Sequence, residues 1–299
     1  MSTKVKSWIS AMRLRTLPLT IACIALGALL AASRSFFSWS IFLLSLSTAL
    51  FLQILSNLAN DYGDTVHGAD HEDREGPLRE VQSGKISLSQ MRVAMAIFVA
   101  LSLISGIVLL QSARLSSQTY LVFLGLGLIA IFAAVLYTNG KLPYGYIGLG
   151  DLSVFMFFGL LGVAGSYFLY HGPWSWDILL PASSCGLLSV AVLNINNIRD
   201  IESDKKAGKY SIPVRIGRSK AVLYHYSLLL LALILAVVFV ILNYQSPLQF
   251  LFLLTAPLLF INARAVRLQS LALKLDPYLK QMAITTLLFC LLFGISMLF

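Results

Sequence analysis

The stretch SIFLLSLSTALFLQILSNLANDYGD, residues 40–64, decides the fold, because it joins a long apolar run to a tight group of acids. A helix crosses a bilayer with about 20 apolar residues, and this run is long enough. The rest of the chain has the same character: 58% of its 299 residues are hydrophobic, 12% are charged, and mean hydropathy is +0.82. Soluble domains carry about 25% charged residues. The sequence therefore predicts an all-α membrane protein whose main solvent is lipid.

Nine apolar runs are candidates for membrane-spanning helices. They are continuous and do not alternate between apolar and polar residues, which argues against a β-barrel. The predicted spans are residues 17–33, 39–59, 89–112, 118–138, 147–170, 176–197, 221–243, 247–263 and 280–298.

The basic residues predict the orientation of these spans. Of the 22 Lys and Arg, all but Arg34 and Arg114 fall in the N-terminal segment or in the loops after the even-numbered spans. Positively charged loops stay in the cytoplasm, so the N-terminus is predicted to be cytoplasmic and the C-terminus outside. This rule, together with anionic lipid, accounts for the net charge of +9, and nucleic-acid binding is a poor explanation of it.

The acidic segment after the second span has a counterpart after the sixth. A shift of 136 positions places Asn60 and Asp64 on Asn196 and Asp200, and Pro77-Leu78-Arg79 on Pro213-Val214-Arg215. A chance match of two polar loops is the alternative. Parallel repeats of this kind place a site where the halves meet. We therefore expect one domain, residues 1–299, built of related four-helix halves, about 13–138 and 147–263, plus a ninth helix, about 280–298.

The acids are spaced for metal binding. Asn197, Asp200 and Asp204 share one face if the sixth helix continues past the membrane, as do Asn60 and Asp64 on the second helix. Oxygen ligands without His or Cys suit Mg²⁺, which binds one or two carboxylates together with phosphate oxygens. Basic residues are interleaved with the acids, which is the composition of a metal–diphosphate site. Two solvated acidic loops are the plainer alternative.

Two further segments carry candidate residues. Tyr137 and Lys141 are four residues apart after the fourth span, where they are either part of a site or an interfacial Tyr and a snorkelling Lys. Arg13 and Arg15 enter the first span, where they either anchor the helix or clamp a diphosphate.

Together these segments resemble the UbiA superfamily of intramembrane aromatic prenyltransferases, and the likeness covers nearly the whole chain. The motifs are Asn60-Asp61-x-x-Asp64, Tyr137-x-x-x-Lys141 and Asp200-x-x-x-Asp204. Asn197 and Gly68 stand where the superfamily often has Asp, and the role of the nearby Asp70 is left open. The resemblance implies metal ligands at Asn60, Asp64, Asn197, Asp200 and Asp204, catalytic roles for Asp61, Asp64, Asp200, Asp204, Tyr137 and Lys141, and diphosphate binding by Arg13, Arg15, Arg79, Arg199 and Lys209.

The segments RLRTLPLT, GPLR and PYGYIGLGD are most similar to the branch of the superfamily that acts on 1,4-dihydroxy-2-naphthoate. The resemblance implies Mg²⁺-dependent transfer from a polyprenyl diphosphate with decarboxylation, giving demethylmenaquinone, in a bacterial inner membrane with the site facing the cytoplasm. Prenylation of an acceptor such as 4-hydroxybenzoate is one alternative. A cation-coupled carrier is another, although its site would lie at midplane and not at one face. A third alternative is a CDP-alcohol phosphotransferase, but the Asp-Gly-x-x-Ala-Arg motif that opens the site of that class is absent from this sequence.

Overall fold

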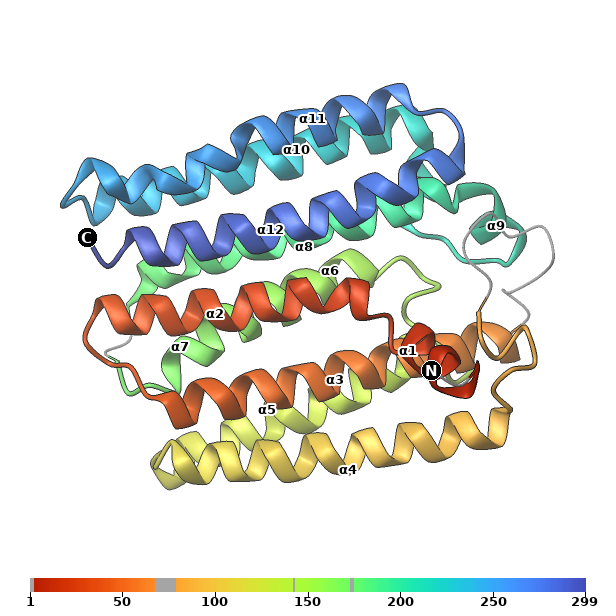
Figure 1. The fold of residues 1–299 in the computed structure, drawn as a ribbon, viewed down its shortest axis with the longest axis horizontal. Helices are drawn as coiled ribbons and strands as arrows, with labels where there is room; N and C mark the ends of the chain where they lie inside the picture. Colours follow the sequence, from red (N-terminus) through yellow and green to blue (C-terminus); the bar gives the residue numbers. More distant parts are fainter. Residues whose placement is uncertain (1–2, 68–78, 142, 173–174) are drawn as a thin grey trace.

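The structure is a computed structural model and describes residues 3–67, 79–141, 143–172 and 175–299. In this part of the chain, long helices lie side by side in one bundle (Figure 1). Among the described residues, nine helical segments are long and apolar enough to cross a membrane, which confirms the predicted number of spans. They are Lys4–Ser33, Trp39–Val66, Leu88–Ser112, Ser117–Leu136, Gly150–Phe168, Trp176–Arg199, Ile212–Leu242, Pro247–Leu268 and Ala272–Ser296.

Several spans contain more than one helical element. The elements are α1 (Thr3–Ala11), η1 (Leu14–Thr16), α2 (Leu17–Ser33), α3 (Trp39–Val66), α4 (Leu88–Ser112), α5 (Ser117–Leu136), α6 (Gly150–Val154), η2 (Phe155–Gly165), α7 (Ser166–Phe168), η3 (Trp176–Ile178), α8 (Leu179–Arg199), α9 (Ile201–Lys206), α10 (Ile212–Leu242), η4 (Pro247–Thr255), α11 (Ala256–Leu268), η5 (Ala272–Leu275) and α12 (Asp276–Ser296). The element η2 is a π-helix.

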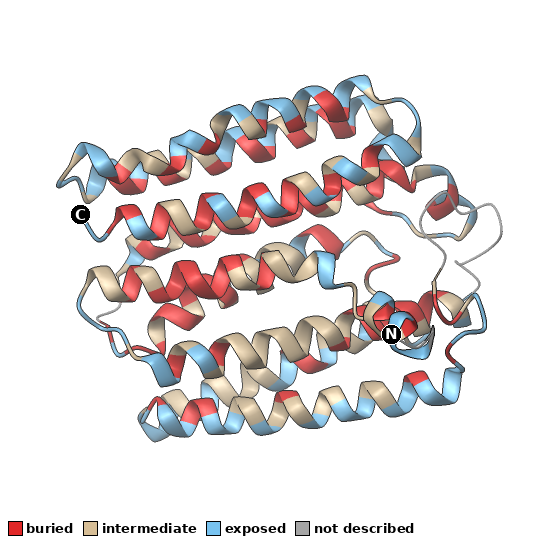
Figure 2. Ribbon diagram, in the orientation of Figure 1, coloured by how far each residue is buried: buried red, intermediate tan, exposed pale blue. Residues whose placement is uncertain are grey.

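Helix α8 lies at the centre of the bundle, where it packs against α10, η2 and α12. Of the apolar stretch in its span, 72% is buried, against 6% for α5 at the periphery (Figure 2). A side chain at Gly159 of η2 would lie 2.8 Å from the carbonyl oxygen of Ala182, so glycine permits this close packing. The outer faces expose large apolar side chains such as Leu121 and Phe132, as a lipid-facing surface requires.

Helices α3 and α10 exceed the predicted apolar runs by the most residues. Helix α3 continues to Val66, so Asn60, Asp61 and Asp64 lie on the helix itself and not in a loop. Helix α10 begins at Ile212, nine residues before the predicted start, and bends at Gly217, where φ is 77°. Hydropathy misses both segments because it falls where a helix leaves the hydrocarbon, although the backbone hydrogen bonds continue.

The proposed halves have matching neighbours. In the first, α3 packs on α2 and α4, and α4 packs on α5; in the second, α8 packs on η2 and α10, and α10 packs on α11. Helix α12 packs against α2 and α8 and so joins both groups. The repeat itself stays a prediction. The end of the bundle where α3 and α8 terminate is called the site end below.

The opposite end of the bundle is tied together by a polar cluster. Arg34, after α2, pairs with Asp177 at 2.6 Å and donates to the hydroxyl of Tyr167 at 3.1 Å. The amide of Asn243, after α10, donates to the same Asp177 carboxylate at 3.1 Å. One of the two basic residues that depart from the orientation rule is therefore neutralised within the protein.

Candidate active site

Helix α3 brings the first acidic motif to the site end. A side chain at Gly63 would lie 2.6 Å from the carbonyl oxygen of Thr138, so glycine lets α3 approach the end of α5 closely. The Thr138 hydroxyl donates to the Asn60 side-chain oxygen at 3.2 Å. Asp61 and Asp64, one helical turn apart, are both buried.

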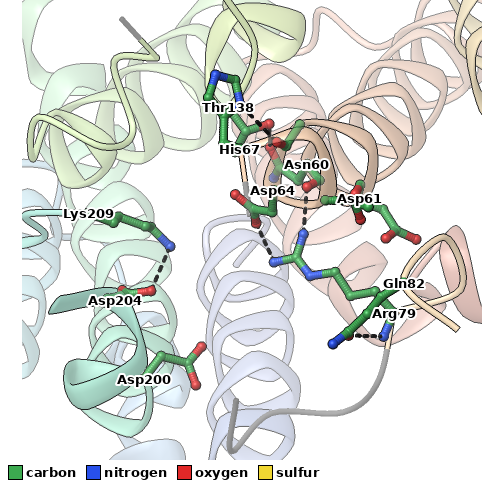
Figure 3. A network of polar contacts seen from close by, with 12 residues as sticks. Asn60, Asp61, Asp64, His67, Arg79, Gln82, Thr138, Asp200, Asp204 and Lys209 are labelled. Carbon is green, nitrogen blue, oxygen red and sulfur yellow. Dashed lines mark hydrogen bonds and ion pairs between the residues drawn. The ribbon is translucent and has the colours of Figure 1, made fainter. Parts of the chain in front are cut away.

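Both carboxylate oxygens of Asp64 have partners. The Tyr146 hydroxyl donates to Oδ1 at 2.8 Å, and the Arg79 guanidinium pairs with Oδ2. Arg79 also donates to the backbone oxygen of Asn60 at 2.5 Å. In Figure 3, Asp61 points away from Asp64, so the two acids of this motif serve different parts of the site.

The second motif lies where α8 ends and α9 begins. Arg199 holds Asp200 with two hydrogen bonds of 2.7 Å, and its Nη1 donates to Asp276 at 2.6 Å. The Asn196 oxygen accepts from Nη2 of the same guanidinium at 2.9 Å. All three side-chain nitrogens of Arg199 have protein partners, so this residue orients Asp200. Its predicted contact with a diphosphate stays a prediction.

Asp204 and Lys209 face Asp64 across the site (Figure 3). Lys209 pairs with Oδ1 of Asp204 at 3.3 Å, while Oδ2 is buried and has no hydrogen bond from the described residues. Burial raises the pKa of Asp204 to about 6, with the Asp200 and Asp64 charges adding to the rise and Lys209 opposing it. Burial lowers the pKa of Lys209, but the Asp204 and Asp64 charges outweigh burial and raise it to about 12.

Two cavities of opposite character meet at these residues. The polar cavity, about 300 Å³, is lined at the site end by Asp61, Arg15, Arg199, Asp200 and Asp204 among others. The apolar cavity, about 400 Å³, runs inward along α2, α3, α4, α5 and η2, past side chains such as Leu110 and Phe123. The residues that line both are Arg13, Asp64, Arg79, Asn196 and Lys209.

The other predicted residues divide into two groups. Asn60, Asn197 and Tyr137 line the apolar cavity near its polar mouth. Burial raises the pKa of Tyr137 to about 12. Arg15 is exposed and pairs with Asp276 at 3.3 Å on the rim of the polar cavity.

The position of Lys141 differs from the sequence-based expectation, and its catalytic role stays a prediction. The sequence places it on the same helical face as Tyr137, but α5 ends at Leu136 and the chain turns at Gly140, where φ is 99°. Lys141 is therefore exposed and lines neither cavity. Asp70 lies outside the described residues.

Sequence reasoning missed Tyr146 as a partner of Asp64 and Asp276 as a partner of Arg199. The run PYGYIGLGD marks a turn that carries Tyr146, but its contact with Asp64 spans 82 positions. The sequence around Asp276 gives less indication of its contact with Arg199, because Asp276 is only an acidic residue at the start of α12.

The donor set fits a hard cation. The acids and amides at the junction offer only oxygen ligands, and Oδ2 of Asp204 is a buried acceptor that lacks a hydrogen-bond donor among the described residues. The described residues contain no preassembled group of three His, Cys, Asp or Glu; Asp64, Asp200 and Asp204 are instead balanced singly by Arg79, Arg199 and Lys209.

Comparison with known proteins agrees with this geometry. The UbiA prenyltransferase family matches residues 20–287. The chain is 45% identical to 1,4-dihydroxy-2-naphthoate octaprenyltransferase of Escherichia coli (strain K12), over 97% of this chain and 94% of that protein. It is 36% identical to the Mycobacterium tuberculosis enzyme of the same name, over 95% and 94%.

Solved structures show the same fold. A UbiA homologue from Aeropyrum pernix K1 in its apo form has a TM-score of 0.71 at 18% identity, covering 93% of this chain and 96% of that one. A UbiA homologue from Archaeoglobus fulgidus bound to DMAPP and Mg²⁺ has a TM-score of 0.62 at 18% identity, covering 98% and 99%. The chain thus belongs to the UbiA prenyltransferase family, an integral-membrane class, and the resemblance drawn from its motifs is confirmed.

Proposed function

We propose that this chain transfers a polyprenyl group from polyprenyl diphosphate to 1,4-dihydroxy-2-naphthoate, with Mg²⁺ as cofactor. Relatives named for an octaprenyl transfer to this acceptor match it at 45% and 43% identity over nearly its full length, which supports the acceptor. The observation that carries the proposal is the junction of a polar and an apolar cavity, since the donor is itself a charged head on a long apolar tail.

The donor fits this junction in one orientation. Its diphosphate occupies the polar cavity, where Arg13, Arg79 and Lys209 supply positive charge. Its isoprenoid tail occupies the apolar cavity and leaves the reacting carbon near Tyr137 and Asp64. Burial of the reacting carbon excludes water, which would quench an allylic cation.

The acids and amides would hold the metal. Asn60, Asp64, Asn197, Asp200 and Asp204 are the proposed ligands, and Asp61 lines the polar cavity beside them. Bound Mg²⁺ neutralises charge on the departing diphosphate. Arg199 keeps Asp200 oriented, and Tyr146 and Arg79 keep Asp64 oriented.

The chemical step forms one carbon–carbon bond and breaks two bonds. The allylic C–O bond ionises and the electron pair leaves with pyrophosphate. An electron-rich ring carbon of the acceptor attacks the allylic cation, and the ring carboxylate leaves as CO₂, which returns its electron pair to the ring. The immediate product is the quinol, and demethylmenaquinone follows when a separate oxidant such as dioxygen removes two electrons and two protons.

The basic residues support a location as well. We propose that the site end faces the cytoplasm of a bacterial inner membrane, because the Lys and Arg residues concentrate there. Acceptor and pyrophosphate are then exchanged with the cytoplasm, while donor tail and product are exchanged with the bilayer.

Product mass spectrometry tests the proposal. Purified protein in detergent receives Mg²⁺, a polyprenyl diphosphate and either 1,4-dihydroxy-2-naphthoate or 4-hydroxybenzoate; the expected product is the prenylated, decarboxylated naphthalene. Asp64→Asn and Asp200→Asn should each lower turnover at least about 100-fold, the scale of losing one oriented charged group. Glu202→Gln, an exposed acid beside Asp200, is the matched control. Exclusive reaction with 4-hydroxybenzoate, or normal turnover in both Asp variants, would contradict the assignment.

A further inference from the structure

The backbone is strained at the entrance to α2. Arg13, between α1 and η1, has φ 50° and ψ 56°, which is the left-handed helical region. A residue with a Cβ pays a steric penalty there, and glycine is the residue that avoids it. Strain of this kind persists only where the surroundings fix the backbone, and it concentrates at functional sites.

Three side chains fix this turn. The Thr16 hydroxyl donates to the Arg13 carbonyl oxygen at 2.9 Å, and the Thr16 backbone N–H donates to the same oxygen at 2.9 Å. From α3, the Asn57 amide donates to the Met12 carbonyl oxygen at 2.9 Å and to the Thr16 hydroxyl at 3.0 Å. The Gln53 amide donates to the Thr16 hydroxyl and to the Asn57 oxygen, both at 3.3 Å.

This network lies at the wall of the apolar cavity, where Thr16 and Gln53 are half-buried and Asn57 is buried. Asn57 is 3% exposed, and Thr16, Gln53 and Asn57 all line the cavity below Arg13. In a low-dielectric environment an amide without partners is costly, so these polar groups keep their hydrogen bonds to one another and to the turn. The carbonyl of Met12 is therefore held by Asn57 of α3, and the carbonyl of Arg13 by Thr16 at the end of η1.

Arg13 itself lines both cavities, at the place where the donor's diphosphate is proposed to lie. We infer that Thr16, Asn57 and Gln53 are positioning residues that act through Arg13, holding its backbone in the left-handed turn so that its guanidinium reaches the diphosphate. The inference rests on the proposed function for the identity of the anion, but its test needs only diphosphate binding. A network that merely joined α2 to α3 would stabilise the fold without affecting anion affinity.

Matched variants of Thr16 separate these two roles. Thr16→Val removes the hydroxyl and keeps the shape, whereas Thr16→Ser keeps the hydroxyl. Full-length protein in detergent is titrated calorimetrically with inorganic pyrophosphate in excess Mg²⁺. We expect the dissociation constant to rise about fivefold to tenfold in Thr16→Val, the scale of one or two hydrogen bonds, and to stay within about twofold of the parent in Thr16→Ser.

Thr255→Val is the control for loss of a buried hydroxyl. The Thr255 hydroxyl also donates to a carbonyl three residues earlier, that of Phe252 at 2.7 Å, and Thr255 lines neither cavity. Pyrophosphate affinity should be unchanged in this variant. Amide hydrogen exchange should accelerate at residues 12–16 in Thr16→Val and not in Thr255→Val, because only the first releases the turn.

A double-mutant cycle tests whether Thr16 acts through Arg13. In an Arg13→Ala background, Thr16→Val should change the dissociation constant less than about twofold, whereas in an Arg79→Ala background it should keep its full effect. Should Thr16→Val fail to fold, Gln53→Met replaces it, with an expected weakening of about threefold in the same cycle.

Equal, additive losses in both backgrounds, or parental affinity in Thr16→Val, would overturn the positioning role. Failure of the proposed function gives a different result: no prenylated product forms from the parent protein with either acceptor, while the pattern of pyrophosphate affinities across the variants is still measurable.

Discussion

Removing the Tyr146 hydroxyl tests how the site holds its first carboxylate. Tyr146→Phe keeps a buried ring that packs 5.9 Å from His67, so the fold should lose little. It deletes the 2.8 Å hydrogen bond to Asp64, whose other oxygen stays paired with Arg79. A hydrogen bond to a charged group contributes about 1.5–3 kcal/mol, which corresponds to roughly 10-fold to 150-fold in an equilibrium or rate.

The loss should fall on the metal-dependent step. We expect kcat/KM for the polyprenyl diphosphate to drop within that range, and the Mg²⁺ concentration for half-maximal rate to rise, because Asp64 is then held by Arg79 alone. Pyrophosphate release measured across a Mg²⁺ titration gives both numbers, and thermal unfolding in detergent measures the fold separately.

Tyr170→Phe is the matched control. The Tyr170 ring is also buried, stacked 6.1 Å from Phe37, but its hydroxyl has no hydrogen-bond partner in the described part of the chain. Its removal should leave kinetics unchanged and stability equal or higher. Parental kcat/KM and Mg²⁺ dependence in Tyr146→Phe would refute the reasoning, as would an equal kinetic loss in Tyr170→Phe.

Three other outcomes are expected. Lys141→Ala should leave kcat and the KM for the donor within about twofold of the parent, because the Lys141 side chain is exposed and lines neither cavity. A tenfold change in either steady-state constant would show that Lys141 acts in the site. Arg34→Ala should lower unfolding free energy by about 1–3 kcal/mol through loss of its pair with Asp177, measured by denaturation in detergent, with product formation retained. Arg13→Gly should relieve about 1–2 kcal/mol of backbone strain, so its thermal midpoint should not fall, yet pyrophosphate affinity should drop at least tenfold; a lowered midpoint would argue against strain.

The fold was predictable because lipid selects for length and apolarity together. Each predicted span overlaps one observed span, and this follows from composition without any tertiary contact. The ends were less predictable: α3 runs to Val66, and its last turns carry Asp64, which pairs with Arg79. Hydropathy carries no information about such pairs.

The candidate site was predictable where a residue type is needed by the chemistry and lies on a regular helix. Asp64 satisfies both conditions, and its role as a ligand stays a prediction. Asp200 satisfies only the first, because it lies between α8 and α9 with φ −96° and ψ 13°. Lys141 does not lie on a regular helix, because α5 ends before it. Tyr146 does not lie on one either, since it contacts Asp64 from a loop that folds back over α3. The aligned Arg79 and Arg215 also diverge: Arg79 pairs with Asp64, whereas Arg215 donates to the carbonyls of Tyr210 and Ile147.

The junction of the two cavities has a practical consequence for work in micelles. A detergent with a linear alkyl chain offers the apolar cavity a narrow hydrocarbon chain, as the isoprenoid tail of the substrate does. This cavity has a volume of about 400 Å³ and runs along α2, α3, α4 and α5. Such a detergent should compete with the isoprenoid tail of the donor but should not affect the binding of free pyrophosphate. Inhibition of prenyl transfer should therefore increase with the alkyl length of the detergent and be absent in nanodiscs. The alkyl length at which inhibition is strongest therefore measures the length of the apolar cavity.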